Sequence, residues 1–447
     1  MDKLTVFMRR LIDIANSNGD TQLTLQQARD TVKEINEFLF TNYEGIGTTF
    51  KLGEHLEYFS DFHKYWQDNY IKILDIKIND AQCEKVAISL HEIWKKTDGK
   101  AFWEIYDTGG IGKDDICRIR FLTANQDFRG SRDFGKLADL FLSDKSIFDE
   151  RRVFEDPELF IKTIGITGLS QNDKRVQYAK HIAKVLIEHD TTPIELIDKF
   201  ERSVLDFRKA ISEYAGSGYG FKKADMFIRD MVVLGVWEDI KDFDKIDVAS
   251  DVNTIKIALR TGIIKSKIPL LSSFLDFFSY QYDYVDEMNA KGWRRVWEHW
   301  YRMYPDECID SPCLMDYFIY KVIGKQFCKE ILCYFRCASN KHEFKWHSSR
   351  NQTCQVCYKN GFRNIKANLI GKTLPCLDED GSIAIQATDF VRQNPSMADI
   401  QHCPFKNICM ENNSSFLQPP KSISIRGQTG WTTAYARRDG GGGGLMA

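Results

Sequence analysis

The feature that most constrains this chain is a glycine turn in residues 217–262 that is followed at once by a helical pattern. Gly218 and Gly220 flank a single residue, and glycine adopts a positive φ without a steric penalty. Such a turn at a helix start leaves backbone N–H groups unpaired, and these groups bind a phosphate well. The apolar residues that recur at helical spacing after the turn are Phe221, Ala224, Phe227, Ile228 and Met231.

Charged residues lie near both ends of this stretch. Lys222 and Lys223 fall in the first turn of the predicted helix, where a positive charge opposes the helix dipole. A second helix start follows, with Ser250 or Asp251 as its N-cap and Gly262 as its end. The buried stripe expected for this second helix is Val252, Ile255 and Leu259. Taken singly, a Gly-x-Gly is most often a plain turn, a lysine a solvated side chain and an N-cap aspartate only a cap.

The combination matches a known motif. Residues 218–224 read Gly-Tyr-Gly-Phe-Lys-Lys-Ala, and in this pattern the chain resembles the helix-hairpin-helix/GPD superfamily of DNA glycosylases, which includes endonuclease III and the 8-oxoguanine DNA glycosylases. The resemblance implies that Lys222 is the catalytic lysine and Asp251 the catalytic aspartate. These two residues are 29 positions apart, more than in endonuclease III, which indicates an insertion around Trp237–Asp247.

Further segments match the family in the same order along the chain, so that the resemblance covers roughly residues 110–330. Residues 122–125, Leu-Thr-Ala-Asn, are similar to the helix end whose side chain fills the hole left by a flipped base, which makes Asn125 or Gln126 the candidate wedge. A polar helix end is the alternative interpretation of this segment. The DNA-contacting residues expected from the resemblance are Gly218, Gly220, Lys223, Asn125 and Gln126.

The cysteines are unevenly distributed. Ten of the twelve lie between Cys308 and Cys409, and in a cytosolic chain this clustering favours a metal centre over disulfides. Endonuclease III holds its iron–sulfur cluster with the pattern C-x6-C-x2-C-x5-C, of which Ile400 here replaces one cysteine. The resemblance thus implies a 4Fe–4S cluster that uses Cys403, Cys409 and two ligands from among Cys328, Cys354, Cys357 and Cys376.

A zinc site is the alternative, and the two centres could coexist. Cys354 and Cys357 form a C-x2-C pair, which is typical of zinc knuckles. The expected ligands are Cys337, Cys354 and Cys357 with another cysteine, His342 or His347. Either metal would be chiefly structural, and the choice between iron–sulfur and zinc stays open at this point.

Composition limits the compartment and the partners. No run reaches the roughly 18 apolar residues of a membrane span, and the first residues lack a signal-peptide core. We therefore expect a cytoplasmic protein with no membrane partner. The formal net charge is −2, so any DNA-binding surface must be a local patch. The expected organisation is mainly α, with an N-terminal helical extension at 1–105, a helix-hairpin-helix glycosylase core at 106–330, a cysteine-rich metal-binding region at 331–415 and a flexible Gly-rich tail at 416–447.

These features predict a DNA N-glycosylase with an associated AP-lyase activity. It would flip a damaged or modified base out of double-stranded DNA and excise it through a lysine and an aspartate. Two alternatives stay open: a nucleosidase that acts on a modified nucleoside, and a non-catalytic helix-hairpin-helix DNA-binding protein. No obligate protein partner is indicated, and the sequence fixes neither the base nor a role in repair or in defence against foreign DNA.

Overall fold

The structure is a computed structural model that describes most of the chain between residues 74 and 374 and shorter segments on either side. The described residues are 6–7, 9–10, 13–14, 30, 34, 48–52, 55–59, 70–72, 74–103, 105–106, 108, 110–127, 134–167, 171–266, 282–327, 332–346, 353–374, 391–392, 403–409, 416–418, 423–428 and 431–436. This part of the protein is mainly helical, as predicted. None of its helices is both long and apolar enough to cross a membrane.

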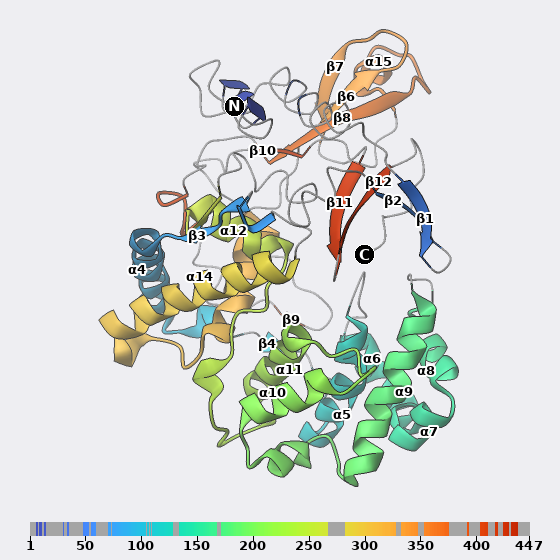
Figure 1. Cartoon of the computed structure of the whole chain (residues 1–447), viewed down its shortest axis with the longest axis vertical. Coiled ribbons are helices and arrows are strands. Elements are labelled where there is room, and N and C mark those ends of the chain that lie inside the picture. The colour runs from blue at the N-terminus through green and yellow to red at the C-terminus, as the bar shows by residue number, and fades with distance from the viewer. Residues whose placement is uncertain are drawn as a thin grey trace.

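The helices form one body around a shared hydrophobic core (Figure 1). Its α-helices are α4 Asp80–Thr97, α5 Lys113–Thr123, α6 Phe134–Ser143, α7 Glu150–Glu155, α8 Pro157–Thr163, α9 Asn172–His189, α10 Val204–Glu213, α11 Phe221–Val233, α12 Val252–Thr261 and α14 Tyr282–Met303. Shorter helices of 3-10 or π type join them: η2 Lys100–Phe102, η3 Ala124–Gln126, η4 Lys145–Phe148, η5 Glu195–Phe200, η6 Phe243–Lys245, η7 Pro305–Glu307, η8 Pro312–Leu314 and η9 Tyr317–Phe327.

The described segment 74–103 belongs to this helical body. Helix α4 lies along α14, where the Cys83 thiol contacts the carbonyl oxygen of Gly292 at 3.8 Å. Just before α4, strand β3 (Lys77–Ile78) pairs antiparallel with β5 (Ile264–Lys265), which follows α12. The boundary expected at residue 105 therefore does not separate two hydrophobic cores.

A small antiparallel sheet carries the cysteine-rich segment and lies at one end of the molecule (Figure 1). Its strands, in spatial order, are β10 Phe416–Gln418, β8 Ala367–Leu374, β6 Leu332–Cys337 and β7 Glu343–Trp346. One helical turn, α15 (Gln355–Lys359), lies between β7 and β8 in sequence. The region has its own hydrophobic cluster, separate from the main core: Phe335, Cys337, Cys354, Cys357 and Ala367.

Strands also occur where the sequence predicted helix or a flexible tail. A second antiparallel sheet contains, in spatial order, β1 Thr48–Leu52, β2 His55–Phe59, β12 Trp431–Ala436 and β11 Ile423–Gln428. A further pair joins β4 Ile105–Tyr106 to β9 Val391–Arg392. Strands therefore occur within both the expected helical extension at 1–105 and the expected Gly-rich tail at 416–447. The glycine run at 440–444 lies outside the described residues.

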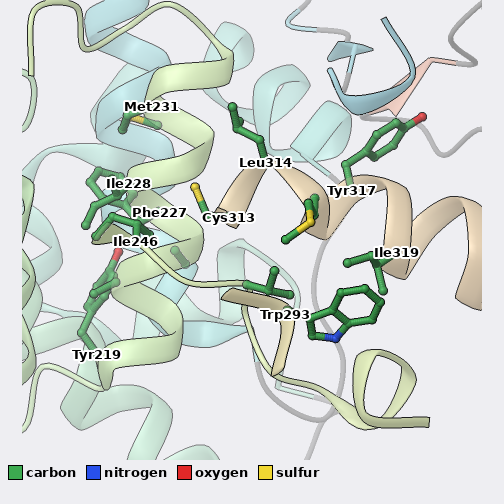
Figure 2. Packing of buried hydrophobic residues seen from close by; sticks show 14 of the residues in the cluster. Tyr219, Phe227, Ile228, Met231, Ile246, Trp293, Cys313, Leu314, Tyr317 and Ile319 are labelled. Atoms are coloured by element: carbon green, nitrogen blue, oxygen red, sulfur yellow. The ribbon is translucent and has the colours of Figure 1, made fainter. Parts of the chain in front are cut away.

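Helix α11 presents its predicted apolar face to the core. Phe227, Ile228 and Met231 are fully buried. The Phe227 ring packs against Phe121 of α5 and Phe207 of α10, with ring centroids 5.5 and 5.9 Å apart, and Figure 2 shows Phe227, Ile228 and Met231 among the buried hydrophobic residues. Phe221, the first residue of the predicted stripe, is instead 53% exposed, because it stands at the open end of the helix beside the glycine turn. Trp237, in the expected insertion, packs edge-on against Phe227 with ring centroids 5.4 Å apart.

Candidate functional sites at the glycine hairpin and the cysteine cluster

The glycine turn lies between α10 and α11. Gly218 has a φ of +73°, in the left-handed region that favours glycine. A Cβ added to Gly218 would lie 2.4 Å from the Tyr178 ring of α9. Both the backbone conformation and the packing therefore require glycine here, and the predicted positive-φ turn is confirmed at this position.

Gly220 serves a different purpose. Its φ of −103° and ψ of 177° are ordinary extended values, and a Cβ placed on it would meet nothing within 4 Å. Within the described part of the chain, no acceptor is paired with the backbone N–H groups of Gly220, Phe221 and Lys222. The first turn of α11 therefore presents free donors to an open space, the arrangement that binds a phosphate at a helix N-terminus.

The two lysines of this turn point to different surroundings. The Lys222 side chain is exposed and forms no hydrogen bond or ion pair with a described residue. The Lys223 ammonium donates to the carbonyl oxygens of Asn125, at 2.6 Å, and Gly218, at 3.2 Å. Burial lowers the pKa of Lys223 to about 8, while the charge of Asp127 acts in the opposite direction. Lys223 therefore fastens the hairpin to η3, and its predicted role as a DNA contact stays a prediction.

The candidate wedge residues are also inside the protein. Asn125 is fully buried, and its amide donates to the carbonyl oxygens of Tyr178 and Ser217 at 3.1 and 2.9 Å. Gln126 is 3% exposed and donates to the carbonyl oxygen of Arg175 at 3.2 Å. Neither side chain is placed to enter a DNA duplex in this structure, because both amides support the backbone of neighbouring segments. Asn125 thus contacts the glycine turn directly, through its hydrogen bond to Ser217.

Asp251 is the N-cap of α12, as the sequence predicted. One carboxylate oxygen accepts a hydrogen bond from the Thr254 backbone N–H at 2.8 Å, and the other accepts one from the Asn253 amide at 2.9 Å. The Thr254 hydroxyl accepts from the Asp251 N–H at 2.9 Å and so completes a capping box. The helix ends at Gly262, with a φ of +75°, also as predicted. Val252 is 36% exposed and lies outside the buried stripe.

Side chains of α14 form hydrogen bonds with the residues around this N-cap. The buried amide of Asn289 donates to the Ser250 hydroxyl at 2.8 Å and to the Thr254 hydroxyl at 3.1 Å. The Ser250 hydroxyl in turn donates to Asp286 at 2.8 Å. Asp251 is thus held rigidly at a helix N-terminus. The structure describes both Asp251 and Lys222, and no hydrogen bond or ion pair joins them. Their joint role in catalysis therefore stays a prediction.

A chain of buried charges beneath the hairpin was not predicted from the sequence. Asp230 of α11 pairs with Arg120 of α5 at 2.6 Å and with its neighbour Arg229 at 2.7 Å. Arg229 also pairs with Asp316. Burial alone would raise the pKa of Asp230, but the two arginines hold it below its ordinary value. The available signal was an Arg-Asp pair inside an otherwise apolar helix face.

The second site is a group of three thiols and one imidazole. Cys337 ends β6, His342 immediately precedes β7, and Cys354 and Cys357 flank the first turn of α15. The four potential ligand atoms lie within 4.8 Å of one another. The Sγ atoms of Cys337 and Cys357 are 3.7 Å apart, and His342 Nε2 is 3.0 Å from the Cys354 Sγ. In the described part of the chain, this is the one group of His, Cys, Asp and Glu residues close enough to hold a metal ion.

Local backbone geometry orients these ligands. The Cys354 thiol accepts a hydrogen bond from the Cys357 N–H at 3.4 Å, and the Cys337 thiol accepts one from the Asn340 N–H at 3.3 Å. The Asn340 amide also donates to the Cys357 Sγ at 3.2 Å. Hydrogen bonds of this kind stabilise thiolates and fix metal ligands in place. The rings of Phe335 and Phe344 stack with their centroids 5.4 Å apart and contribute to the small apolar cluster of this region. Residues 332–346 and 353–374 are called the cysteine module below.

The donor set suits a single ion. Two thiolates on one tetrahedral zinc ion, each about 2.3 Å from the metal, lie about 3.8 Å apart. The 3.7 Å separation of Cys337 and Cys357 agrees with that spacing. A four-iron cluster, which contains its own sulfides, would hold its cysteine ligands farther apart. The Cys3His group can therefore hold one metal ion.

The structure groups Cys354 and Cys357 with Cys337 and His342 rather than with Cys403 or Cys409, while an iron–sulfur set that uses Cys328 and Cys376 instead stays a prediction. Cys403 packs in the main hydrophobic core, whereas Cys354 and Cys357 lie in the separate small cluster of the module. The zinc interpretation correctly included Cys337 and offered His342 as a fourth ligand. Three residues named as potential ligands lie outside the described residues: Cys328, His347 and Cys376.

Comparison with known proteins adds no assignment. No family model matches the chain, and no curated protein matches its sequence. The function is therefore inferred from the residues and geometry described above.

Proposed function

We propose that this protein is a DNA N-glycosylase with AP-lyase activity, acting on a damaged or modified base in double-stranded DNA. The observation that carries the proposal is the open first turn of α11. There, the backbone N–H groups of residues 220–222 have no described acceptor, the position beside Gly220 is open, and Lys222 is exposed. The resemblance to the helix-hairpin-helix glycosylases supports the same assignment.

In the proposed reaction the hairpin binds a phosphate of the strand that carries the target base. The target nucleotide leaves the helix, at a cost of a few kcal/mol in lost stacking. The unprotonated amine of Lys222 then attacks the sugar C1′. A bond forms between Nζ and C1′ while the glycosidic C–N bond breaks, and its electron pair leaves with the base, which takes up a proton.

The covalent product explains the lyase activity. Loss of a proton from the lysine nitrogen and opening of the sugar ring give a Schiff base. Removal of a C2′ proton then expels the 3′ phosphate by β-elimination, which breaks the strand. Asp251 would stabilise positive charge on the sugar or accept a proton. Its two hydrogen-bonded oxygens keep the carboxylate fixed at the start of α12.

Borohydride trapping tests this proposal. Borohydride reduces a Schiff base to a stable amine, so we expect a covalent protein–DNA band with a duplex that contains the correct base. The panel would include 8-oxoguanine, oxidised pyrimidines, hypermodified cytosines and an abasic site. Lys222→Gln should abolish the band. Asp251→Asn keeps a capping side chain and should slow base release by at least about 100-fold.

Lys209→Gln is the matched control, because Lys209 is an exposed lysine on α10, across the hairpin. It removes the same charge and should trap normally. A band of full strength in Lys222→Gln would refute the lysine assignment. Base release from free nucleosides alone would favour a nucleosidase. DNA binding without base release, retained in Lys222→Gln and Asp251→Asn, would favour a non-catalytic binding protein.

For the cysteine module we propose zinc as the metal, bound by Cys337, His342, Cys354 and Cys357. Three thiolates and an imidazole in a closed arrangement are typical of structural zinc sites. Metal analysis of the purified protein should give one zinc per chain, and Cys354→Ser with Cys357→Ser should remove it. Iron with acid-labile sulfide, lost in the same variant, would contradict the assignment.

A further inference from the structure

The residues that directly follow the Cys354–Cys357 pair (the knuckle) form a continuous solvent-exposed segment. Residues 358–364 read Tyr-Lys-Asn-Gly-Phe-Arg-Asn, and each of the seven is exposed. Tyr358 is 56% exposed and Phe362 is 64% exposed, the largest value among the exposed large hydrophobic residues that the structure describes. Exposed aromatic side chains that occur together in one short segment are candidates for an interaction site.

The segment that contains these two rings is rich in positive charge. Residues 337–367 contain six basic residues and one acidic residue, in a chain whose net charge is −2. The acidic residue, Glu343, is paired with Arg336 at 3.0 Å. Four exposed cations of the module make no ion pair with any residue that the structure describes: Lys341, Lys359, Arg363 and Lys366.

The cysteine group brings these cations together. The Asn340 amide contacts the Cys357 thiol, which places the Lys341 turn beside the knuckle. The Ala338 N–H donates to the carbonyl oxygen of Lys366 at 3.0 Å, which ties that lysine to the same end of the sheet.

The exposed run itself also folds back on the knuckle. The Phe362 N–H donates to the carbonyl oxygen of Cys357 at 2.9 Å, and the bend before it is made at Gly361, where φ is +85°. Metal ligation thus sets the position of the exposed run relative to the neighbouring lysines.

We propose that this surface, the residues 358–364 with Lys341 and Lys366, binds an unpaired stretch of DNA strand. The lysines and Arg363 would contact phosphates, and the rings of Tyr358 and Phe362 would stack on bases. This combination of basic groups and accessible aromatic rings is the usual means of binding a single strand without reading its sequence. The choice of DNA over RNA rests on the proposed function; the surface itself does not involve the glycine hairpin.

An unpaired strand fits this surface better than a duplex does. In a duplex the base faces are covered by their neighbours, so the two rings could contact only the edges of the bases or the sugars. Where a strand is unpaired, each base has a free face, and stacking contributes about 1–3 kcal/mol per base. Cations alone would bind duplex and single strand alike.

The test is fluorescence anisotropy of the full, metal-loaded chain with labelled oligothymidine, duplex DNA of the same length and oligouridine. Tyr358→Ala/Phe362→Ala removes the rings, and Lys359→Gln/Arg363→Gln removes two charges. Tyr301→Ala, a 51% exposed ring on α14, and Lys85→Gln/Lys95→Gln, two exposed lysines on α4, are the matched controls. Metal content is measured for every variant to confirm that the module is intact.

We expect the ring variant to weaken oligothymidine binding by at least about tenfold, with a smaller effect on duplex binding. The charge variant should weaken both and reduce the dependence of log affinity on log salt by roughly two charges. The controls should bind as wild type does. Unchanged oligothymidine affinity in both module variants, with the metal retained, would overturn the proposal, as would losses confined to oligouridine. Lys222→Gln should leave this binding intact, so failure of the glycosylase proposal is detected separately.

Discussion

The helical body and the cysteine module are stabilised in different ways. The body buries a long series of large apolar side chains, with Trp293 and Trp300 fully enclosed. The module's cluster consists of five buried residues, and three of those are the cysteines of the metal-binding group. The helical body thus has an extensive apolar core, whereas the module has a small one built largely from its candidate metal ligands.

Orders of magnitude support this contrast. Full burial of a large apolar side chain contributes about 1.5–3 kcal/mol. Fixing the backbone of one residue costs about 1–2 kcal/mol. Apart from the three cysteines, the cluster of residues 332–346 and 353–374 contains only Phe335 and Ala367 as buried residues, with Phe344, Val356 and Ile365 partly buried against them. In the proposed zinc site, metal binding would supply much of the stability of this region.

The largest expected effect is that of metal removal. A strong chelator, or Cys354→Ser with Cys357→Ser, should unfold residues 332–374 and leave the helical body folded. Binding free energies of structural zinc are about 10–16 kcal/mol in zinc-finger peptides, so the local loss should be complete. Hydrogen exchange should show loss of protection in β6 and β8 and unchanged protection in α11. If protection from exchange persists in both regions without metal, the module does not depend on metal for its stability and this prediction is contradicted.

The next effect is expected in the body and should leave the metal in place. Asp230→Ala would leave Arg120 and Arg229 buried without their shared carboxylate. Breaking a buried pair in this way costs about 3–5 kcal/mol of unfolding free energy, measurable by denaturant titration. Asp139→Ala, at an exposed position of α6, is the control and should cost less than about 0.5 kcal/mol. Loss of metal from the Asp230 variant would show that the two regions are coupled.

The two hairpin glycines should separate stability from binding. Gly218→Ala introduces a side chain at positive φ and against Tyr178, so we expect a loss of roughly 1–3 kcal/mol of stability. Gly220→Ala enters open space and should cost less than about 1 kcal/mol, because its backbone is already extended. It should nevertheless weaken duplex binding, since a methyl group would hinder close approach of a phosphate. If both variants change stability and duplex binding equally, the assignment of Gly218 to stability and Gly220 to binding is contradicted.

The smallest effect concerns Lys223 and pH. Burial lowers its pKa from 10.5 to about 8, so between those values the unfolded chain holds a proton that the folded protein has released. Stability must then rise with pH across that window. The unfolding free energy of wild type relative to Lys223→Met should increase by on the order of 1–3 kcal/mol as the pH rises through this window. A difference that is constant with pH would show that the lysine is solvated in solution.

Local features were predictable because their causes are local. The positive φ at Gly218, the apolar face of α11, the Asp251 cap and the stop at Gly262 each follow from neighbouring residues. The C-x2-C pair likewise indicated a metal knuckle through its spacing alone. Nothing local distinguishes Lys222 from Lys223, yet one side chain reaches solvent and the other reaches η3. The direction of each depends on where α5 packs.

By itself the sequence determined a glycine turn that opens a helix, a capped second helix and a cysteine-rich segment with the spacing of metal ligands. These depend on φ preferences, capping and ligand spacing over a few residues. Tertiary structure decided that Asn125 and Gln126 are buried supports, that Cys354 and Cys357 pair with Cys337 and His342, and that strands of the C-terminal segment join β2. Such outcomes depend on contacts between residues far apart in sequence, because packing decides which side of each element is covered.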